Sequence, residues 1–308
     1  MGIAIIGTGA IAEVHAEALL RAGRSISAVS GVDEEQVAKF ADRFEVQTRY
    51  KNSAELLASD LVDSVIIATP SQYHAELAIA ALECHKPVLC EVPISLDFLS
   101  FERVKKAAES SKAFAAVAQT LRYSEPYMRL KEMLLEQSPE SMNILIRRLM
   151  FRQENIGWTG VRRTWVDSAV WHHGSHCFDL ATWLLGSRKF NAQLYGGPKW
   201  SNGEVMEVNG VLRSNSGQTA TVNVSYHSRI SYNDVVVITE SNTFEVSHGR
   251  LTCNGETLVS SADGNDSLVD AVGRQNFTFL RAVETGELSE IIQVDELEEV
   301  YRLLALVC

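Results

Sequence analysis

Gly2-Ile-Ala-Ile-Ile-Gly7-Thr8-Gly9-Ala10-Ile11-Ala12 is the stretch that decides the fold of this chain. Its apolar run from Gly2 to Gly7 is typical of a strand buried on both faces of a parallel sheet. Gly7 then permits a tight turn, Gly9 lets backbone N–H groups approach a pyrophosphate, and Ala12 allows a helix to pack closely on the strand. This GxGxxA pattern, followed by a helix over residues 11–22, predicts a dinucleotide site. The predicted cofactor-binding residues here are Gly7, Thr8, Gly9, Ala10 and Ile11.

Strand and helix patterns alternate through the next eighty residues. Strands are predicted over residues 26–30, 64–68 and 86–91, and helices over residues 33–44 and 73–82. This alternation indicates a doubly wound α/β fold, in which ligands bind at the carboxyl ends of the strands. Residues at these strand ends are therefore further cofactor-binding candidates: Ser30, Thr69, Pro70, His74, Glu91, Val92 and Pro93. A structural role is the equal alternative for His74, and His15 is expected to be a packed or capping histidine.

The second half of the chain has a different pattern. After residue 120, strands are predicted over residues 142–151, 190–194, 206–212, 219–226, 233–239 and 243–246, and a closing helix over 294–307. Their close spacing favours antiparallel pairing. The predicted fold class is α/β. An N-terminal Rossmann domain with a doubly wound parallel sheet spans residues 1–120, and a C-terminal α+β domain on an open, mostly antiparallel sheet spans residues 121–308.

Three histidines and a carboxylate lie close together in Trp171-His172-His173-Gly-Ser-His176-Cys-Phe-Asp179. If residues 168–185 are helical, His172 and His176 share one face, and Asp179 follows His176 by one turn. Histidine suits general acid/base work near neutral pH, so His176, His172 and Asp179 are the predicted catalytic residues, with Asp179 orienting His176. A metal site is the weaker alternative, because the chain has no HExxH helix and no CxxC pair. Helix capping or a buried polar role is the structural alternative.

The end of the second predicted strand bears on the choice of cofactor. An NAD-preferring Rossmann enzyme places Asp or Glu there to bind both ribose hydroxyls, whereas this chain has Ser30-Gly31. Asp33 is expected to cap the next helix instead. The missing acid favours NADP. NAD remains the alternative, because no arginine follows at once to grip a 2′-phosphate.

Composition excludes several classes of partner. The 28 basic and 39 acidic residues give a net charge of -11, which disfavours binding to nucleic acid or to an anionic membrane. No apolar stretch is long enough to span a bilayer, and the start of the chain has no signal-peptide pattern. Five cysteines without paired spacing favour reduced thiols and a cytoplasmic location.

Four elements carry a family resemblance: the GxGxxA start, Val65-Ile-Ile-Ala-Thr-Pro-Ser-Gln-Tyr-His74, Ala81-Leu-Glu-Cys-His-Lys-Pro-Val-Leu-Cys-Glu-Val-Pro93, and Gly174-x-His176-x-x-Asp179. Together they resemble the Gfo/Idh/MocA family of NAD(P)-dependent oxidoreductases. The resemblance implies a homodimer or homotetramer formed through the open C-terminal sheet. Two departures stand out, since Val92 replaces a family lysine and His172 replaces a family aspartate. Both replaced residues belong to the catalytic group of members that act on sugars.

One branch of the family is more similar, through Phe151-Arg152-x-x-Asn155-Ile156, Arg163-Thr-Trp165-x-Asp167 and Trp171-His172-His173. Enzymes of that branch oxidise hemiacetals of aromatic ring-cleavage semialdehydes with NADP. The resemblance implies a carboxylated small-molecule substrate, and guanidinium groups suit two-point binding of carboxylates. The predicted substrate residues are Arg122, Tyr123, Arg152, Arg163, Trp165 and His173. A sugar or cyclitol dehydrogenase and a non-catalytic dinucleotide-sensing regulator are the alternative functions.

Overall fold

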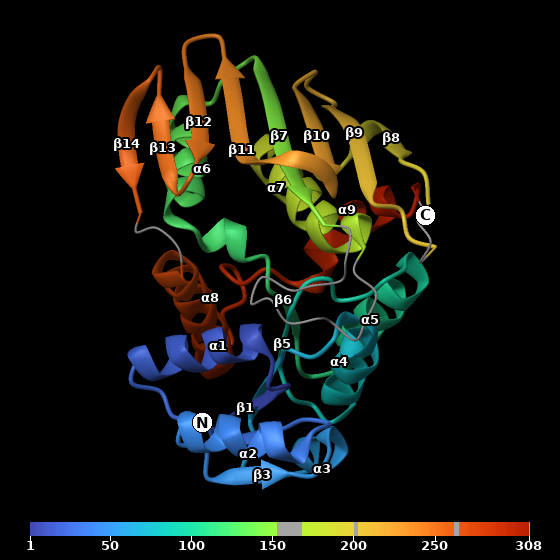
Figure 1. The fold of residues 1–308 in the computed structure, drawn as a ribbon, viewed down its shortest axis with the longest axis vertical. Coiled ribbons are helices and arrows are strands. Elements are labelled where there is room, and N and C mark those ends of the chain that lie inside the picture. Colours follow the sequence, from blue (N-terminus) through green and yellow to red (C-terminus); the bar gives the residue numbers. More distant parts are fainter. Residues whose placement is uncertain (153–167, 200–202, 262–264, 308) are drawn as a thin grey trace. The chain divides into compact units, whose positions relative to one another are not determined.

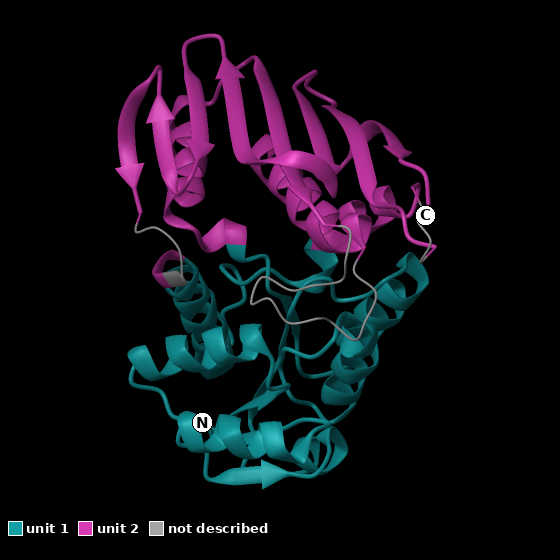
Figure 2. Cartoon of the chain, viewed as in Figure 1, with its two compact units in different colours: residues 1–120, 268–296 teal, residues 121–267, 297–308 magenta. Residues whose placement is uncertain are grey.

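The computed structural model describes residues 1–152, 168–199, 203–261 and 265–307. The chain forms two compact units, coloured separately in Figure 2. Unit 1 contains residues 1–120 and 268–296, and unit 2 contains residues 121–267 and 297–308. The sequence assigns residues 268–296 to the second domain, whereas the structure packs them into unit 1. The reason is the helix α8 (Asn265–Thr285), whose Val269 and Val272 form a buried cluster with Val14 and Ala18.

Unit 1 is built on a six-stranded parallel sheet with the order β3-β2-β1-β4-β5-β6. Its strands are β1 (Ile3–Ile6), β2 (Ala28–Ser30), β3 (Thr48–Tyr50), β4 (Ser64–Ile67), β5 (Val88–Cys90) and β6 (Ala115–Val117). All four residues of β1 are buried, as expected for a strand covered on both faces. Strand β1 pairs with both β2 and β4, so the chain reverses its winding there. This switch point is where doubly wound sheets bind ligands.

Helices cover the sheet of unit 1 (Figure 1): α1 (Ala10–Arg21), α2 (Glu34–Arg43), α3 (Ser53–Leu57), α4 (His74–Glu83), α5 (Phe98–Ser110) and α8. Short polar side chains start several of them. Asp33 accepts hydrogen bonds from two first-turn N–H groups of α2, and Asn52 and Asp97 cap α3 and α5 in the same way. The predicted cap at Asp33 is therefore confirmed. The predicted doubly wound architecture is confirmed as well.

Unit 2 is built on an eight-stranded sheet with the order β14-β13-β12-β11-β7-β10-β9-β8 (Figure 1). The strands are β7 (Met142–Phe151), β8 (Phe190–Gly196), β9 (Glu207–Ser214), β10 (Thr219–Ser225), β11 (His227–Thr239), β12 (Thr243–Ser247), β13 (Arg250–Cys253) and β14 (Glu256–Ser260). Only the β7–β10 pair is parallel among these described strands. The predicted, mostly antiparallel sheet is thus confirmed, although the sequence did not predict β13 and β14.

One face of this sheet is covered by α6 (Glu125–Gln137), α7 (Ser175–Leu185) and α9 (Glu298–Leu304). Alternate residues of β7, β9 and β10 are buried beneath them, which is the pattern of a sheet with one covered face. The helix predicted over residues 294–307 is wrong at its start. A 3-10 turn over Val294–Leu297 comes first, and α9 begins only at Glu298.

The predicted helix over residues 168–185 also differs from the structure. Ala169–Gly174 form a π-helical turn, and the regular α7 follows from Ser175. Ser168 caps the π turn by accepting a hydrogen bond from the N–H of Trp171. Such turns often occur at functional sites, because the inserted residue redirects the side chains around it.

None of the described helices is long and apolar enough to cross a membrane.

Candidate active site

The glycine loop between β1 and α1 has the geometry that a dinucleotide pyrophosphate requires. Gly7 has φ +116, and a Cβ atom there would lie 2.4 Å from the carbonyl oxygen of Ala68, so only glycine fits. Gly9 caps α1 in an extended conformation, and a Cβ atom there would meet nothing within 4 Å. None of the side chains that the structure describes caps α1, so within the described chain open space and unpaired helix N–H groups meet at Gly9. A helix start of this kind binds anions, and the loop therefore fits the phosphates of a dinucleotide.

Ser30 ends β2 beside this loop. Its carbonyl accepts a hydrogen bond from the N–H of Gly7 at 2.8 Å, which joins the glycine loop to the strand end. The hydroxyl of Ser30 is buried and has no hydrogen-bond partner among the described residues. Asp33, the nearest acid after the strand, uses its carboxylate to cap α2. The end of β2 therefore carries no carboxylate for the two ribose hydroxyls.

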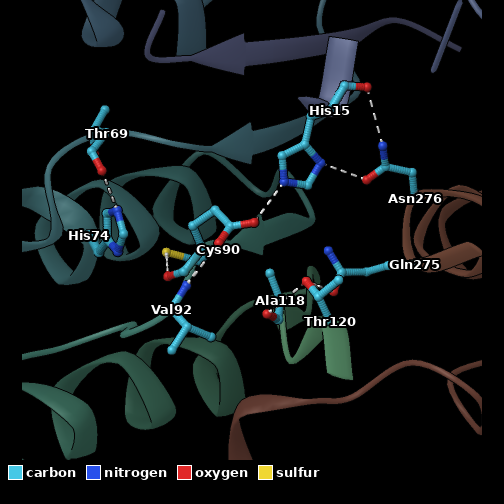
Figure 3. Close-up of polar contacts among 10 residues, drawn as sticks. His15, Thr69, His74, Cys90, Val92, Ala118, Thr120, Gln275 and Asn276 are labelled. Atoms are coloured by element: carbon cyan, nitrogen blue, oxygen red, sulfur yellow. Dashed lines mark hydrogen bonds and ion pairs between the residues drawn. The ribbon is translucent and has the colours of Figure 1, made fainter. Parts of the chain in front are cut away.

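His74 connects the segments that follow β4 and β5, and Figure 3 shows its contact with Thr69. Its ring is buried, with Nδ1 2.7 Å from the carbonyl oxygen of Pro93 and Nε2 2.7 Å from that of Thr69. Burial lowers the pKa of His74, while the hydrogen bonds to these two carbonyls raise it. Both ring nitrogens are thus used within the protein, which supports the structural alternative for His74. Its contacts fix two segments predicted to bind the cofactor.

His15 is a residue that sequence reasoning left out of the site. It is completely buried on α1, and its Nε2 lies 2.8 Å from Oε1 of Glu91. Its Nδ1 lies 2.8 Å from Oδ1 of Asn276 on α8. The partner on α8 is 261 positions away along the chain, so no local pattern could have indicated this contact.

The histidines of unit 2 form a cluster around the π turn. The rings of His172 and His173 stack at 4.5 Å with planes 3° apart, and the ring centroid of His176 lies 6.1 Å from that of His172. The structure therefore brings together the pair that the sequence predicts. His173 is buried, and its Nδ1 lies 2.5 Å from the hydroxyl of Tyr226. The ring of His173 is thus directed toward Tyr226, and its predicted substrate role stays a prediction.

Tyr226 and Arg152 extend the cluster. Tyr226 is fully buried after β10, and the guanidinium of Arg152 lies 4.9 Å from the centroid of its ring. The same guanidinium donates to the Tyr226 hydroxyl at 3.5 Å. Arg152 therefore lies next to the histidine cluster through Tyr226, and its side chain is only half-exposed. Sequence reasoning missed Tyr226, since its strand pattern is that of a core residue.

Burial determines the protonation of the cluster. Removal from water, followed by the charges of His172 and Arg148, lowers the pKa of His176 to about 3. Burial, with His172 the next largest contribution, also lowers the pKa of His173 well below its ordinary value. Both imidazoles are therefore neutral at pH 7. A neutral imidazole has a lone pair that can accept a proton.

Asp179 does not orient His176 as predicted. Its two carboxylate oxygens accept hydrogen bonds from Arg122, at 2.9 Å from Nε and 2.5 Å from an amino nitrogen. A planar guanidinium matches both oxygens of a carboxylate at once, which explains why this pairing prevails over an imidazole one turn away. Burial raises the pKa of Asp179, and Arg122 offsets part of that rise. Among the described residues, Arg122 thus contacts the carboxylate of Asp179, and Tyr123 beside it is buried.

Two predicted substrate residues, Arg163 and Trp165, lie outside the described residues. Within the described ranges, no three His, Cys, Asp or Glu side chains converge on a point where a metal ion could be held.

Two family models match this chain and together span most of it. Residues 1–120 match the oxidoreductase family with an NAD-binding Rossmann fold, and residues 126–258 match the C-terminal domain of bacterial oxidoreductases. The chain belongs to the Gfo/Idh/MocA oxidoreductase family. Unit 1 accordingly carries the NAD-binding Rossmann fold of that family.

Relatives within the Gfo/Idh/MocA family are named dehydrogenases. The 4-carboxy-2-hydroxymuconate-6-semialdehyde dehydrogenase of Sphingobium sp. is 29% identical over 74% of this chain and 73% of its own length. The inositol 2-dehydrogenase of Corynebacterium glutamicum is 27% identical over 62% of this chain and 56% of its own length. The chain therefore aligns with only about half of the inositol enzyme.

Solved structures of more distant proteins share the fold. An oxidoreductase from Agrobacterium radiobacter in complex with NAD+, L-tartaric acid and magnesium has a TM-score of 0.82 at 19% identity, covering 100% of this chain and 95% of that one. The WlbA dehydrogenase from Bordetella pertussis in complex with NADH and UDP-GlcNAcA has a TM-score of 0.82 at 17% identity, covering 100% and 94%. At these identities the likeness concerns the fold.

Proposed function

We propose that the protein is an NAD(P)-dependent dehydrogenase that removes hydride from a hydroxyl-bearing carbon of a carboxylated small molecule. The hemiacetal of an aromatic ring-cleavage semialdehyde is the proposed substrate type. The observation that carries this proposal is the alignment with the semialdehyde dehydrogenase over about three quarters of both chains. The histidine cluster supports it, because His173 and His176 are neutral imidazoles in a chain that lacks the family lysine.

The proposed cofactor contacts follow from unit 1. The backbone from Gly7 to Ile11 binds the pyrophosphate, and Thr69 and Pro70 line the carboxyl end of β4. A bound nicotinamide dinucleotide supplies the hydride acceptor. NADP is the proposed cofactor, since Ser30 leaves no carboxylate to repel a 2′-phosphate, and NAD is the second choice.

The proposed proton acceptor is the pair His172 and His176. Oxidation of a hydroxyl-bearing carbon releases one hydride and one proton, and the proton passes from the hydroxyl oxygen to an imidazole nitrogen. His176 is neutral above a pH of about 3, so it has a lone pair available throughout the neutral range. His173 supports the pair by stacking on His172 while it is held by Tyr226.

Arginine side chains are the proposed contacts to substrate carboxylates. Arg152 is placed next to the histidine cluster by its contacts with Tyr226. Arg163 and Trp165 are further proposed substrate contacts, because of their place in the Arg163-Thr-Trp165-x-Asp167 motif. Arg122 contributes by holding the carboxylate of Asp179, which lies on α7.

A homodimer or homotetramer through the open face of the second sheet completes the proposal. Leu145, Val211 and Ile238 are exposed on β7, β9 and β11 of this sheet. Leu145 and Val211 lie in one cross-strand row on either side of Thr221 of β10, since each pairs with it. Exposed apolar residues on one sheet face can contribute to an interaction surface.

A cyclitol dehydrogenase is the second candidate, and the similarity to inositol dehydrogenases favours it. The test is to mix the protein with NADP+ or NAD+ and follow the absorbance of the reduced nicotinamide. Carboxylated ring-cleavage semialdehydes and then neutral polyols are added to separate samples. Reduction of the cofactor in the samples that contain semialdehydes supports the proposal. Reduction of the cofactor only in the samples that contain polyols supports the cyclitol candidate. Dinucleotide binding without any turnover would favour the regulator.

A further inference from the structure

Three polar residues from distant parts of unit 1 form a buried line of hydrogen bonds (Figure 3). His15 lies in the middle, on α1 and one turn beyond the glycine loop. Its two ring nitrogens each lie 2.8 Å from an oxygen, one of Glu91 and one of Asn276. A buried polar group that is fully paired fixes the position of its partners, because leaving one of them unpaired costs free energy.

The protons of this line can be assigned from its geometry. The amide nitrogen of Asn276 donates to the backbone carbonyl of His15 at 3.4 Å, so the amide oxygen faces Nδ1. Nδ1 must therefore carry a hydrogen. The contact between Nε2 and Glu91 then needs one more proton, on the ring or on the carboxyl group, because two lone pairs would repel each other. Either arrangement leaves the pair His15 and Glu91 without net charge.

Glu91 lies on the side of the sheet where the second half of a dinucleotide would bind. It follows β5, and β4 and β5 lie on one side of β1, while β2 lies on the other. The pyrophosphate binds after β1 and the adenosine ribose at the end of β2, so the nicotinamide half extends over β4 and β5. The Glu91 side chain is 13% exposed, and among the described residues its Oε2 contacts the N–H of Val92 at 3.4 Å. That oxygen retains the capacity to accept a ribose hydroxyl.

We propose that His15, backed by Asn276, is a positioning residue that holds Glu91 to bind the nicotinamide half of the cofactor. This inference rests on the proposed function only for the binding of the dinucleotide.

The experiment compares two reduced dinucleotides with ADP, which shares only their adenine half. Binding of NADPH, NADH and ADP is titrated for the parent protein and for His15→Asn, Glu91→Gln and the double variant. We expect each single variant to bind the reduced dinucleotides roughly tenfold more weakly, as for the loss of one charge-assisted hydrogen bond. Affinity for ADP should remain within about twofold of the parent. The double variant should be no weaker than the single variants, since the two residues act through one contact.

His85→Asn is the matched control, because His85 is an exposed histidine of unit 1 in a left-handed conformation that asparagine tolerates. This control variant should change neither the affinity for the reduced dinucleotides nor the affinity for ADP. Thermal unfolding of every variant shows whether the fold is kept. If His15→Asn is unfolded, Glu91→Gln alone decides the question.

Equal loss of ADP and dinucleotide affinity, or unchanged affinity for both in Glu91→Gln, would overturn the positioning role. A parent protein that binds no dinucleotide would overturn this inference together with the proposed function. A parent that binds dinucleotide with the expected variant pattern, but oxidises none of the substrates, would overturn the proposed function alone.

Discussion

Replacing Gly9 by valine should separate cofactor binding from folding. Gly9 has φ -79 and ψ 178, a conformation that valine also adopts, and an added Cβ atom there meets nothing within 4 Å. The free energy of unfolding should therefore fall by about 1 kcal/mol or less, the cost of a poorer helix cap. The new side chain instead fills the space through which a pyrophosphate approaches the backbone.

The expected loss of affinity can be worked from the hydrogen bonds that valine blocks. A hydrogen bond to a charged group contributes about 1.5–3 kcal/mol, so losing one of them should weaken dinucleotide binding about 10–100-fold. The assay is a titration of NADPH and NADH followed by nicotinamide fluorescence, with thermal unfolding measured on the same samples.

Gly7→Ala is the informative comparison, because it should damage the fold itself. A residue at φ +116 is strained unless it is glycine, and its Cβ atom would lie 2.4 Å from the backbone oxygen of Ala68. Strain and overpacking together should cost on the order of 2–5 kcal/mol. A folded Gly9→Val variant with an unchanged dinucleotide titration would refute the assignment of this loop to the pyrophosphate.

Four further expectations concern the cofactor and the histidine cluster. Ser30→Asp should shift the affinity ratio toward NAD by repelling the 2′-phosphate, and a constant ratio would mean that another residue reads the ribose. His176→Asn should lower kcat about 10²–10⁴-fold with cofactor affinity unchanged, as for a lost proton acceptor, and near-full turnover would contradict that role. Asp179→Asn should destabilise the fold by about 3–5 kcal/mol, because it breaks a largely buried ion pair by removing the charge of one partner; a melting temperature equal to that of the parent would show that the pair is dispensable. The pKa values of His173 and His176 are lowered in the folded protein, so the unfolded chain binds more protons than the folded protein between pH 3 and 6.5. The free energy of unfolding, measured with denaturant, should therefore fall as the pH falls through that range. The fall should be less steep in His176→Asn.

The local features of the fold could be predicted because they depend on neighbouring residues. The buried strand before Gly7, the tight turn and the cap at Asp33 each follow from a few adjacent side chains, and the structure has all of them. Alternating apolar residues likewise indicated β7 and β10, because one face of their sheet is buried.

The features that could not be predicted depend on contacts across the fold. Arg122 donates to Asp179, which is 57 positions away along the chain. Because of this contact, the carboxylate of Asp179 is held by Arg122 and not by His176. The π turn before α7 has the same apolar pattern as an α-helix, so the direction of His173 toward Tyr226 was not visible in the sequence. Helix α8 was also not predicted, and with it the partner of His15 was missed.

The most direct test of the central claim is the appearance of reduced nicotinamide when the protein and NADP+ meet a carboxylated ring-cleavage semialdehyde. The account predicts reduction of NADP+ with this substrate, and loss of that reduction in Gly9→Val and in His176→Asn. Turnover of myo-inositol without turnover of the semialdehyde would contradict the proposed substrate class. A protein that binds NADP+ tightly and reduces it with neither compound would contradict its assignment as a dehydrogenase of such substrates.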